Sequence, residues 1–441
     1  MDGLVRTTSL ADAVRTLRTD AVGVREHTER AIERIAAVDP VVQAFVAEPG
    51  RADRLREAAR DLATRAWPDR LPSLYGVPVG VKDIVHVDGL PTRAGSTLPT
   101  EVLKGGQAVV VDRLLRAGAL IAGKTVTAEF AVAAPGPTRN PHRPEHTPGG
   151  SSSGSAAAVA AGLVPLAIGT QTIGSVIRPA AYCGVVGFKP SHGRVPLDGV
   201  LPTSPSYDTV GTFTATVADA VLAAECLCDD WRQAPATTGR PVLGVPEGPY
   251  LGFTEPEALA VFDQQVNTLR AAGYAVERVP VFETFEQDAF ALFVVNLHEL
   301  ARSHADWYAR YPDLYDPRTA DAILQGRRVG PADYTGALRK RQAFRDRLTE
   351  ATSRHGVDVW IAPAATGPAP KGLDNAGDSV MSLPWSAAGL PTLTVPAGRS
   401  TTELPLGLQC VAGHGQDERL LHWALDLEAA LSPERLPSAG R

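Results

Sequence analysis

From about residue 75, short runs rich in valine, isoleucine and glycine alternate with runs that have helical spacing. Strand-like runs lie at 119–125, 164–170 and 185–191, whereas 109–118 and 156–164 have the composition of helices. Such alternation is typical of α/β proteins, in which a helix connects neighbouring parallel strands. The pattern therefore predicts an α/β fold with a largely parallel central sheet.

The rest of the chain is mainly helical and flanks this region. Residues 1–65 contain amphipathic runs, so we expect an N-terminal helical arm, with Ser9 capping its first helix. Residues 284–356 are mostly helical with proline breaks, which indicates a helical insertion or lid. No repeat or low-complexity linker separates these parts, so we expect one domain over residues 1–441. Further helices are expected at 216–228 and 255–272, and further strands at 274–281, 358–364 and 390–398.

The overall composition is that of a folded, slightly acidic protein. Hydrophobic residues make up 44% and charged residues 21% of the 441 positions, and the net charge is -6. Such a chain lacks the basic surface that nucleic acids and anionic membranes attract. The longest weakly polar stretch is interrupted by Gly162 and Pro165, and the first twenty residues carry acids without a continuous apolar core. We therefore expect a soluble, cytoplasmic protein that binds neither nucleic acid nor a membrane.

The cysteines and histidines do not suggest a metal site or a disulfide framework. Four scattered cysteines are interpreted as small apolar core residues: Cys183, Cys226, Cys228 and Cys410. His142 and His146 flank Pro144, which prevents them from sharing one helical face. We expect no metal and no cofactor.

The stretch "GGSSSGS" at 149–155 places three serines between glycines, directly before an alanine-rich run. A flexible linker would have polar flanks on both sides, and this stretch does not. The pattern also fits a nucleophile elbow centred on Ser152, but that motif requires a preceding strand, and 138–148 is a polar loop with three prolines. The sequence favours a sharp, ordered turn that aims a hydroxyl group.

A second serine, Ser175, stands 24 residues after Ser151 in "GTQTIGSVIRPAAYCG". Small and hydroxyl residues again lead into a serine that precedes an apolar segment. Backbone N–H groups in such a turn can form an anion-binding nest, which is the geometry an oxyanion hole needs.

Lys82 is the candidate proton acceptor. Only six of the 43 basic residues are lysine, and this one lies inside the apolar run 77–87. Strand alternation places Val81 and Asp83 on the opposite face, so a buried Lys82 would have a lowered pKa and could act as a general base. An ordinary strand lysine that reaches solvent is the alternative.

Four segments in the same order resemble the amidase signature family: "GVPVGVKDIVHVDGLPTRAGS", "TPGGSSSGSAAAVAAG", "GTQTIGSVIRPAAYCGVVGFKPSHGRVP" and "AGLPTLTVPAG" with "LPLGLQCVAG". The resemblance extends from about residue 30 to 425. It implies a single α/β domain with a central mixed sheet surrounded by helices. It also implies a Ser-Ser-Lys triad, which by motif position is Lys82, Ser151 and Ser175.

The resemblance further implies a mechanism for hydrolysing an amide. Ser175 would attack the carbonyl, Ser151 would relay the proton to neutral Lys82, and a cis peptide bond would precede Ser151. Backbone N–H groups would hold the oxyanion at Thr172, Ile173, Gly174 and Ser175. The neighbouring serines would mainly make loop and helix-start hydrogen bonds, and Ser152 is a candidate for orienting the triad.

Two departures from the family pattern surround Ser175. Gln171 stands where the family usually has Asp, and Ile177 stands where it usually has Arg, with Arg178 one position later. A carboxylate and its arginine partner are replaced together, so we expect no orphan charge. Ile173 replaces a usual glycine, and a β-branched residue disfavours a positive φ.

The expected partner is a small-molecule amide, with a homodimer as a candidate assembly. Phe285, Phe290, Phe293 and Trp385 are aromatic candidates for the acyl pocket, with Trp385 and Phe290 as the substrate-binding choices. They predict faster cleavage of aryl amides than of glutamine. The alternatives to a free-standing amidase are a subunit of a glutamine-dependent amidotransferase, an esterase and a non-catalytic scaffold.

Overall fold

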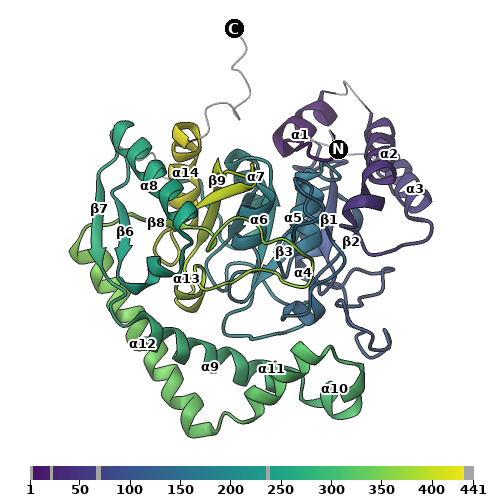
Figure 1. Ribbon diagram of the computed structural model, residues 1–441. Helices are drawn as coiled ribbons and strands as arrows, with labels where there is room; N and C mark the ends of the chain where they lie inside the picture. The colour runs from purple at the N-terminus through teal and green to yellow at the C-terminus, as the bar shows by residue number, and fades with distance from the viewer. Residues whose placement is uncertain (1–2, 20–22, 66–70, 235–238, 432–441) are drawn as a thin grey trace.

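The computed structural model describes residues 3–19, 23–65, 71–234 and 239–431, and a ten-stranded sheet forms its centre (Figure 1). The strands lie in the order β2-β1-β3-β5-β4-β9-β10-β8-β6-β7. Their bounds are β1 Pro78–Lys82, β2 Leu120–Thr125, β3 Leu166–Gln171, β4 Val186–Lys189, β5 Thr209–Thr214, β6 Leu243–Glu247, β7 Val276–Pro280, β8 Val359–Pro363, β9 Thr392–Arg399 and β10 Pro405–Val411.

The sheet is mixed, so the prediction of a largely parallel sheet is wrong and the mixed sheet implied by the family resemblance is confirmed. β1 runs parallel to β2 and β3, and β6 runs parallel to β7 and β8. All five pairs from β3 through β5, β4, β9 and β10 to β8 are antiparallel. For β9 and β10 the reason is in the connection: a short turn, not a crossover helix, joins them, and its Ser400 N–H donates to the Leu404 carbonyl at 2.9 Å.

Helices surround the sheet (Figure 1). The α-helices are α1 Leu10–Arg18, α2 Val24–Val42, α3 Arg51–Thr64, α4 Val109–Arg116, α5 Ser153–Ala160, α6 Ile177–Cys183, α7 Val217–Leu227, α8 Pro256–Ala271, α9 Phe285–Ser303, α10 Ala305–Arg310, α11 Pro317–Arg327, α12 Pro331–Arg354, α13 Leu383–Ala387 and α14 Asp417–Leu431. Short 3₁₀ turns are η1 Glu129–Ala131, η2 Pro249–Phe253 and η3 Pro312–Leu314. None of the helices in this described part of the chain is long and apolar enough to cross a membrane.

The serine-rich stretch leads into α5, a short helix that lies against the sheet. Every residue of α5 is buried, which its alanine, serine and glycine side chains allow. A Cβ atom on Gly154 would lie 2.2 Å from the Ala44 carbonyl oxygen, so only glycine fits this approach. The stretch is therefore an ordered core segment, and the linker interpretation is wrong.

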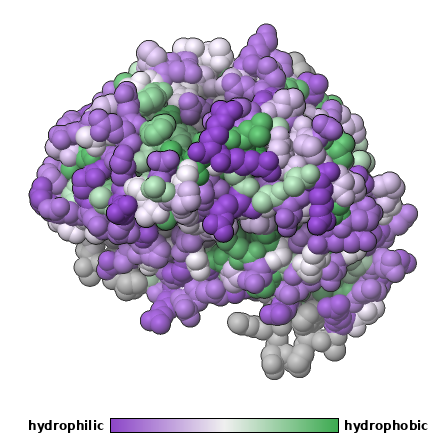
Figure 2. All heavy atoms as spheres, turned by 90° about the horizontal axis from the view of Figure 1, so that it is seen from below, coloured by the Kyte–Doolittle hydropathy of each residue, from purple (hydrophilic) through white to green (hydrophobic). Residues whose placement is uncertain are grey.

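The N-terminal arm forms α1 to α3, and Ser9 caps α1 by accepting from the Asp12 N–H at 3.2 Å. The predicted insertion forms α9 to α12, which lie below the sheet in Figure 1. Seen from that side, hydrophobic patches lie among hydrophilic residues (Figure 2). The helical character of 284–356 is confirmed, and its role as a lid stays a prediction. Residues 1–2, 20–22, 66–70, 235–238 and 432–441 of the expected single domain lie outside the described residues.

Candidate active site

Lys82 is the last residue of β1 and its side chain is fully buried. Its Nζ lies 2.8 Å from the Ser151 Oγ and 2.8 Å from the Thr170 Oγ1. The strand is shorter than predicted, because the chain turns after Lys82 and the Asp83 carbonyl accepts from the Ala94 N–H. Asp83 pairs with Lys124 at 2.9 Å, so its carboxylate points away from Lys82, as the alternation predicted.

Burial lowers the pKa of Lys82 to about 7, although the negative charge of Asp208 acts in the opposite direction. A neutral amine is therefore accessible near neutral pH. Lys189 offers a comparison, since burial also lowers its pKa to about 7. Its Nζ, however, donates to the carbonyl oxygens of Pro190 and Leu390. Contact with a serine hydroxyl, and not burial alone, distinguishes Lys82.

The turn before α5 brings Ser151 to the lysine. The Gly150–Ser151 peptide bond is cis, as the resemblance implied, and Gly149 has φ 79°. A Cβ atom at position 149 would lie 2.9 Å from the Pro179 Cα, so the turn requires glycine there. Ser151 is 1% exposed and its carbonyl accepts from the Ala128 N–H at 3.0 Å.

The serines after Ser151 bind backbone groups. The Ser152 hydroxyl donates to the Thr170 carbonyl at 3.1 Å and accepts from the Thr170 N–H at 3.3 Å. Ser153 and Ser155 donate to carbonyl oxygens of Val126 and Ile168. Ser152 thus holds the residue that Lys82 contacts, and full burial makes it unsuited to the role of an exposed nucleophile.

Ser175 lies in the turn between β3 and α6. It is 9% exposed, compared with 0% for Lys82 and 1% for Ser151, so it is the most accessible of the three. Within the described residues, none of the four backbone N–H groups from 172 to 175 donates a hydrogen bond. Unpaired N–H groups are rare in folded proteins, and a row of them beside a serine can receive an oxyanion.

Gln171 organises this turn. Its Oε1 accepts from the N–H groups of Val176 and Ile177 at 2.7 and 3.0 Å. Its Nε2 donates to the Ser386 Oγ at 2.9 Å, and that hydroxyl donates to the Ile173 carbonyl at 2.6 Å. The position needs both an acceptor and a donor, and an uncharged amide supplies both. Ile173 is not among the described residues with positive φ, so its β-branched side chain fits the turn.

We expected no buried charge without a partner near Ser175, and Arg178 contradicts this expectation. It is 7% exposed, its Nη2 donates to the Gly150 carbonyl at 2.7 Å, and its Nε has no hydrogen-bond partner among the described residues. Burial lowers its pKa, while Tyr182 and Asp378 act in the opposite direction. The arginine has a structural use, because it ties the start of α6, directly after the turn with Ser175, to the peptide bond before Ser151.

The four aromatic candidates do not share one environment. Trp385 is fully buried in a cluster with Tyr250 and Phe282, and its indole N–H donates to the Tyr250 hydroxyl at 3.1 Å. Phe285 belongs to the same core cluster, and Phe293 packs against it. Phe290 is 72% exposed on α9. Trp385 thus has no surface open to a substrate in this conformation, because it is packed inside a core cluster.

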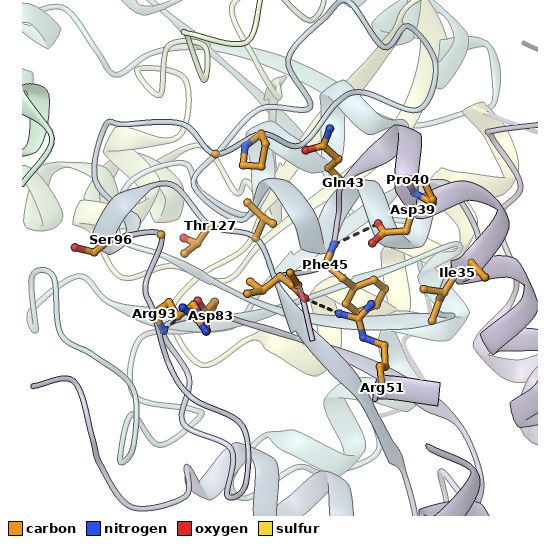
Figure 3. A pocket seen from close by; sticks show the side chains of 17 residues that line it. Ile35, Asp39, Pro40, Gln43, Phe45, Arg51, Asp83, Arg93, Ser96 and Thr127 are labelled. Carbon is orange, nitrogen blue, oxygen red and sulfur yellow. Dashed lines mark hydrogen bonds between the residues drawn. The ribbon is translucent and has the colours of Figure 1, made fainter. Parts of the chain in front are cut away.

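A cavity of about 630 Å³ lies beside the N-terminal arm, and Figure 3 shows its lining. Phe45 and Arg51 lie on one side of it, with Asp83, Arg93 and Thr127 on the other (Figure 3). No residue of the predicted triad lines it. It is therefore a neighbour of the site and does not contain it.

The remaining histidine and cysteine candidates have separate surroundings. His142 Nε2 lies 3.0 Å from the Cys183 carbonyl, whereas His146 Nδ1 lies 2.7 Å from the Ala369 carbonyl. All four cysteines are unbridged, and all but the half-buried Cys226 are buried, which agrees with their interpretation as small apolar residues.

Sequence reasoning missed three polar residues at this site: Thr170, Ser386 and Asp208. Asp208 is a buried carboxylate that accepts from the Thr172 Oγ1 at 2.6 Å. Burial raises its pKa to about 6, against the effect of hydrogen bonds and of Lys82. The only sequence signal is the hydroxyl-rich segment 203–208 before β5.

Known proteins resemble the whole chain. The sequence profile of the amidase family, described as "Amidase", matches residues 26–421. A protein from Synechococcus sp. (strain WH7803) that forms part of a glutamyl-tRNA(Gln) amidotransferase is 34% identical, over 96% of this chain and 97% of the relative. A putative amidase, AmiD, from Mycobacterium tuberculosis (strain H37Rv) is 32% identical, over 94% of this chain and 91% of the relative.

A solved structure has the same fold. A crystal structure of an amidase superposes with a TM-score of 0.88 and 33% identity, covering 96% of this chain and 100% of that one. The match extends across the sheet, the helices and the insertion, as the coverage requires. Together with the profile match over 26–421, this places the fold and the sequence in one group: the chain belongs to the amidase signature family.

Proposed function

We propose that this protein hydrolyses a small-molecule amide through a serine acyl-enzyme, with Ser175 as nucleophile, Ser151 as proton relay and Lys82 as base. The observation that carries this proposal is the 2.8 Å contact between the Lys82 Nζ and the Ser151 Oγ, made by a fully buried lysine. Burial lowers the pKa of that lysine to about 7, so its neutral form can accept a proton.

In the acylation step, the Ser175 Oγ attacks the amide carbonyl carbon. Its proton passes to the Ser151 Oγ, while Ser151 gives its own proton to Lys82. The carbonyl oxygen becomes an oxyanion, which the N–H groups at 172–175 receive. Collapse of this intermediate breaks the C–N bond, and the proton returns along the same relay to the leaving amine.

In the deacylation step, water replaces the amine. Lys82 and Ser151 take a proton from the water as it attacks the ester carbonyl. The same N–H groups hold the second oxyanion, and Ser175 recovers its proton when the acid leaves. The net reaction consumes one amide and one water and yields one carboxylic acid and one amine, with no need for a cofactor.

An amidotransferase role is the second candidate, because the chain is 34% identical to a component of a glutamyl-tRNA(Gln) amidotransferase. Both roles would use the same acyl-enzyme chemistry. A hydrolase releases the leaving amine to solvent, whereas an amidotransferase passes on the ammonia that it takes from glutamine. Similarity to a putative amidase at 32% favours neither role by itself. The two are separated by substrate and by dependence on a partner.

The test uses the purified full chain and a panel of glutamine, short aliphatic amides and aryl amides. We expect hydrolysis of a non-glutamine amide without a partner, and stoichiometric labelling of Ser175 by a fluorophosphonate. Ser175→Ala is the control, since it should lose both. Efficient ammonia release from glutamine, or activity only with a co-purifying partner, would favour the amidotransferase role.

A further inference from the structure

Asp208 is a buried carboxylate that the proposed mechanism does not use. It is 7% exposed and accepts from the Thr172 hydroxyl at 2.6 Å. Backbone N–H groups of Thr203 and Ser204 donate to its other oxygen at 2.8 and 2.9 Å. All three donors are neutral, so its charge is held by hydrogen bonds instead of an ion pair. A buried charge without a paired cation is costly, which raises the question of what it serves.

The position of Asp208 relates it to Lys82. Lys82 contacts the hydroxyl of Thr170, and Asp208 contacts the hydroxyl of Thr172. Thr170 is the next-to-last residue of β3 and Thr172 the first residue beyond it, so the two hydroxyls belong to one short segment, and the charge of Asp208 acts on Lys82. Thr172 also begins the segment 172–175, whose N–H groups donate to no other group in the described part of the chain and can receive an oxyanion.

The helical insertion holds the loop that carries Asp208. Glu299 of α9 accepts from the hydroxyls of Ser204 and Ser206 at 2.8 and 2.7 Å. Arg341 of α12 donates to the Ser206 carbonyl at 2.8 Å. The hydroxyl of Tyr207 donates to a backbone carbonyl of α9 at 3.0 Å. The insertion therefore fixes the residues on the chain immediately before the carboxylate.

We propose that Asp208, held in place by the helical insertion, is a positioning residue that fixes Thr172 for oxyanion binding and provides a negative charge beside Lys82. The proposal rests on the proposed function, because it assigns Asp208 an effect on the base and on the oxyanion segment of that reaction. Asp208 touches neither the substrate nor the transferred proton.

The direction of the electrostatic effect follows from the charges. A negative Asp208 favours the ammonium form and raises the pKa of Lys82, opposing the effect of burial. The charged groups bound to the same loop are Glu299 and Arg341. Arg178 is a further charged group near the site, and it donates to the Gly150 carbonyl. Removing the charge at 208 would therefore lower the pKa of Lys82. Because Asp208 and Lys82 interact, their titrations are coupled and the measured values belong to the pair.

The experiment measures the rate of fluorophosphonate labelling of Ser175 from pH 5 to 9. In this reaction the serine oxygen bonds to phosphorus, fluoride leaves and the serine proton passes to the relay, so no natural substrate is needed. The rate should fall on the acid side of its pH profile as Lys82 gains a proton, and we call this fall the acid limb. For Asp208→Asn we expect the acid limb to move to lower pH by about one unit. We also expect its plateau rate to fall roughly 10- to 100-fold, because the single oxygen of Asn is needed by the N–H groups of Thr203 and Ser204, and its NH2 group cannot accept from Thr172.

Two further variants separate the two effects. Thr172→Val removes the hydroxyl and keeps the charge at 208, so we expect a lower plateau and an acid limb that does not move to lower pH. Asp417→Asn is the control, since Asp417 is a buried carboxylate that accepts from the Ser191 N–H and hydroxyl and acts electrostatically on Lys189, although it also pairs with Arg194 at 3.6 Å. We expect it to leave the acid limb in place.

The outcomes are distinguishable. A wild-type chain that is not labelled at Ser175 would refute the proposed function itself. A labelled wild type with an unshifted acid limb in Asp208→Asn would overturn the electrostatic part of this inference. If Asp208→Asn has no cooperative melting transition, Thr172→Val still tests whether the Thr172 hydroxyl matters. A wild-type plateau rate in Thr172→Val would overturn the positioning role of Asp208.

Discussion

The pH dependence of turnover gives the most direct test of Lys82 as the base. Burial lowers the pKa of Lys82 to about 7. At pH 7 about half of the molecules then carry a neutral amine, whereas an ordinary lysine would be neutral in about 0.04% of them. Burial thus provides roughly a 10³-fold gain in competent enzyme. We expect kcat/KM to fall about tenfold per unit below pH 6 and to level off above pH 8.

The assay is kcat/KM for the best amide of the panel, measured from pH 5 to 9 for the wild type and three variants. Lys82→Arg should be nearly as inactive as Lys82→Ala, because a guanidinium keeps its proton throughout this range. Lys189→Arg is the control, since it preserves a cation that can donate to the carbonyls of Pro190 and Leu390. An active Lys82→Arg variant with a normal melting temperature, or a wild-type rate that is flat from pH 5 to 8, would refute the assignment.

Four further substitutions and one control test other parts of the site. Ser175→Ala should abolish turnover, while Ser151→Ala should retain a trace, since loss of a proton relay costs roughly 10²- to 10⁴-fold in kcat; equal losses in both would contradict the division of roles. Gly174→Ala should lower kcat/KM, because its Cβ would lie 2.9 Å from a serine Cβ in the facing loop, whereas Gly252→Ala, with no atom within 4 Å, should not. Gln171→Leu leaves two backbone N–H groups without an acceptor, each costing about 1–3 kcal/mol, so urea unfolding should show a less stable protein and unchanged stability would be contrary evidence.

The local elements could be predicted from sequence more fully than the sheet. Residues expected to be helical at 216–228 and 255–272 form α7 and α8, because amphipathic spacing is a local property. The direction of the central strands depends on how each pair is connected. β5 was not identified, and it pairs antiparallel with both β3 and β4. Periodicity alone does not encode such long-range pairing.

The site shows the same division between local and distant information. Lys82 and Ser151 could be brought together only through the family resemblance, since 69 residues separate them. Asp208 carries no motif, and its contact with Thr172 depends on a loop fixed by α9 and α12. The aromatic candidates Phe285 and Trp385 belong to a core cluster, because large aromatic side chains fill a core as readily as a pocket and the sequence does not distinguish the two.

Two buried lysines show why a lowered pKa does not identify a base. Burial lowers the pKa of both Lys82 and Lys189 to about 7, and each is near a carboxylate that acts in the opposite direction. Lys189 donates to two backbone carbonyls, which stabilise the ammonium and have no proton to give. Lys82 lies 2.8 Å from the hydroxyl of Ser151, which can give one. The chemical difference between the two sites therefore lies in whether the partner of the lysine carries a proton. In the proposed mechanism Lys82 needs both the hydroxyl of Ser151 and the burial that lowers its pKa.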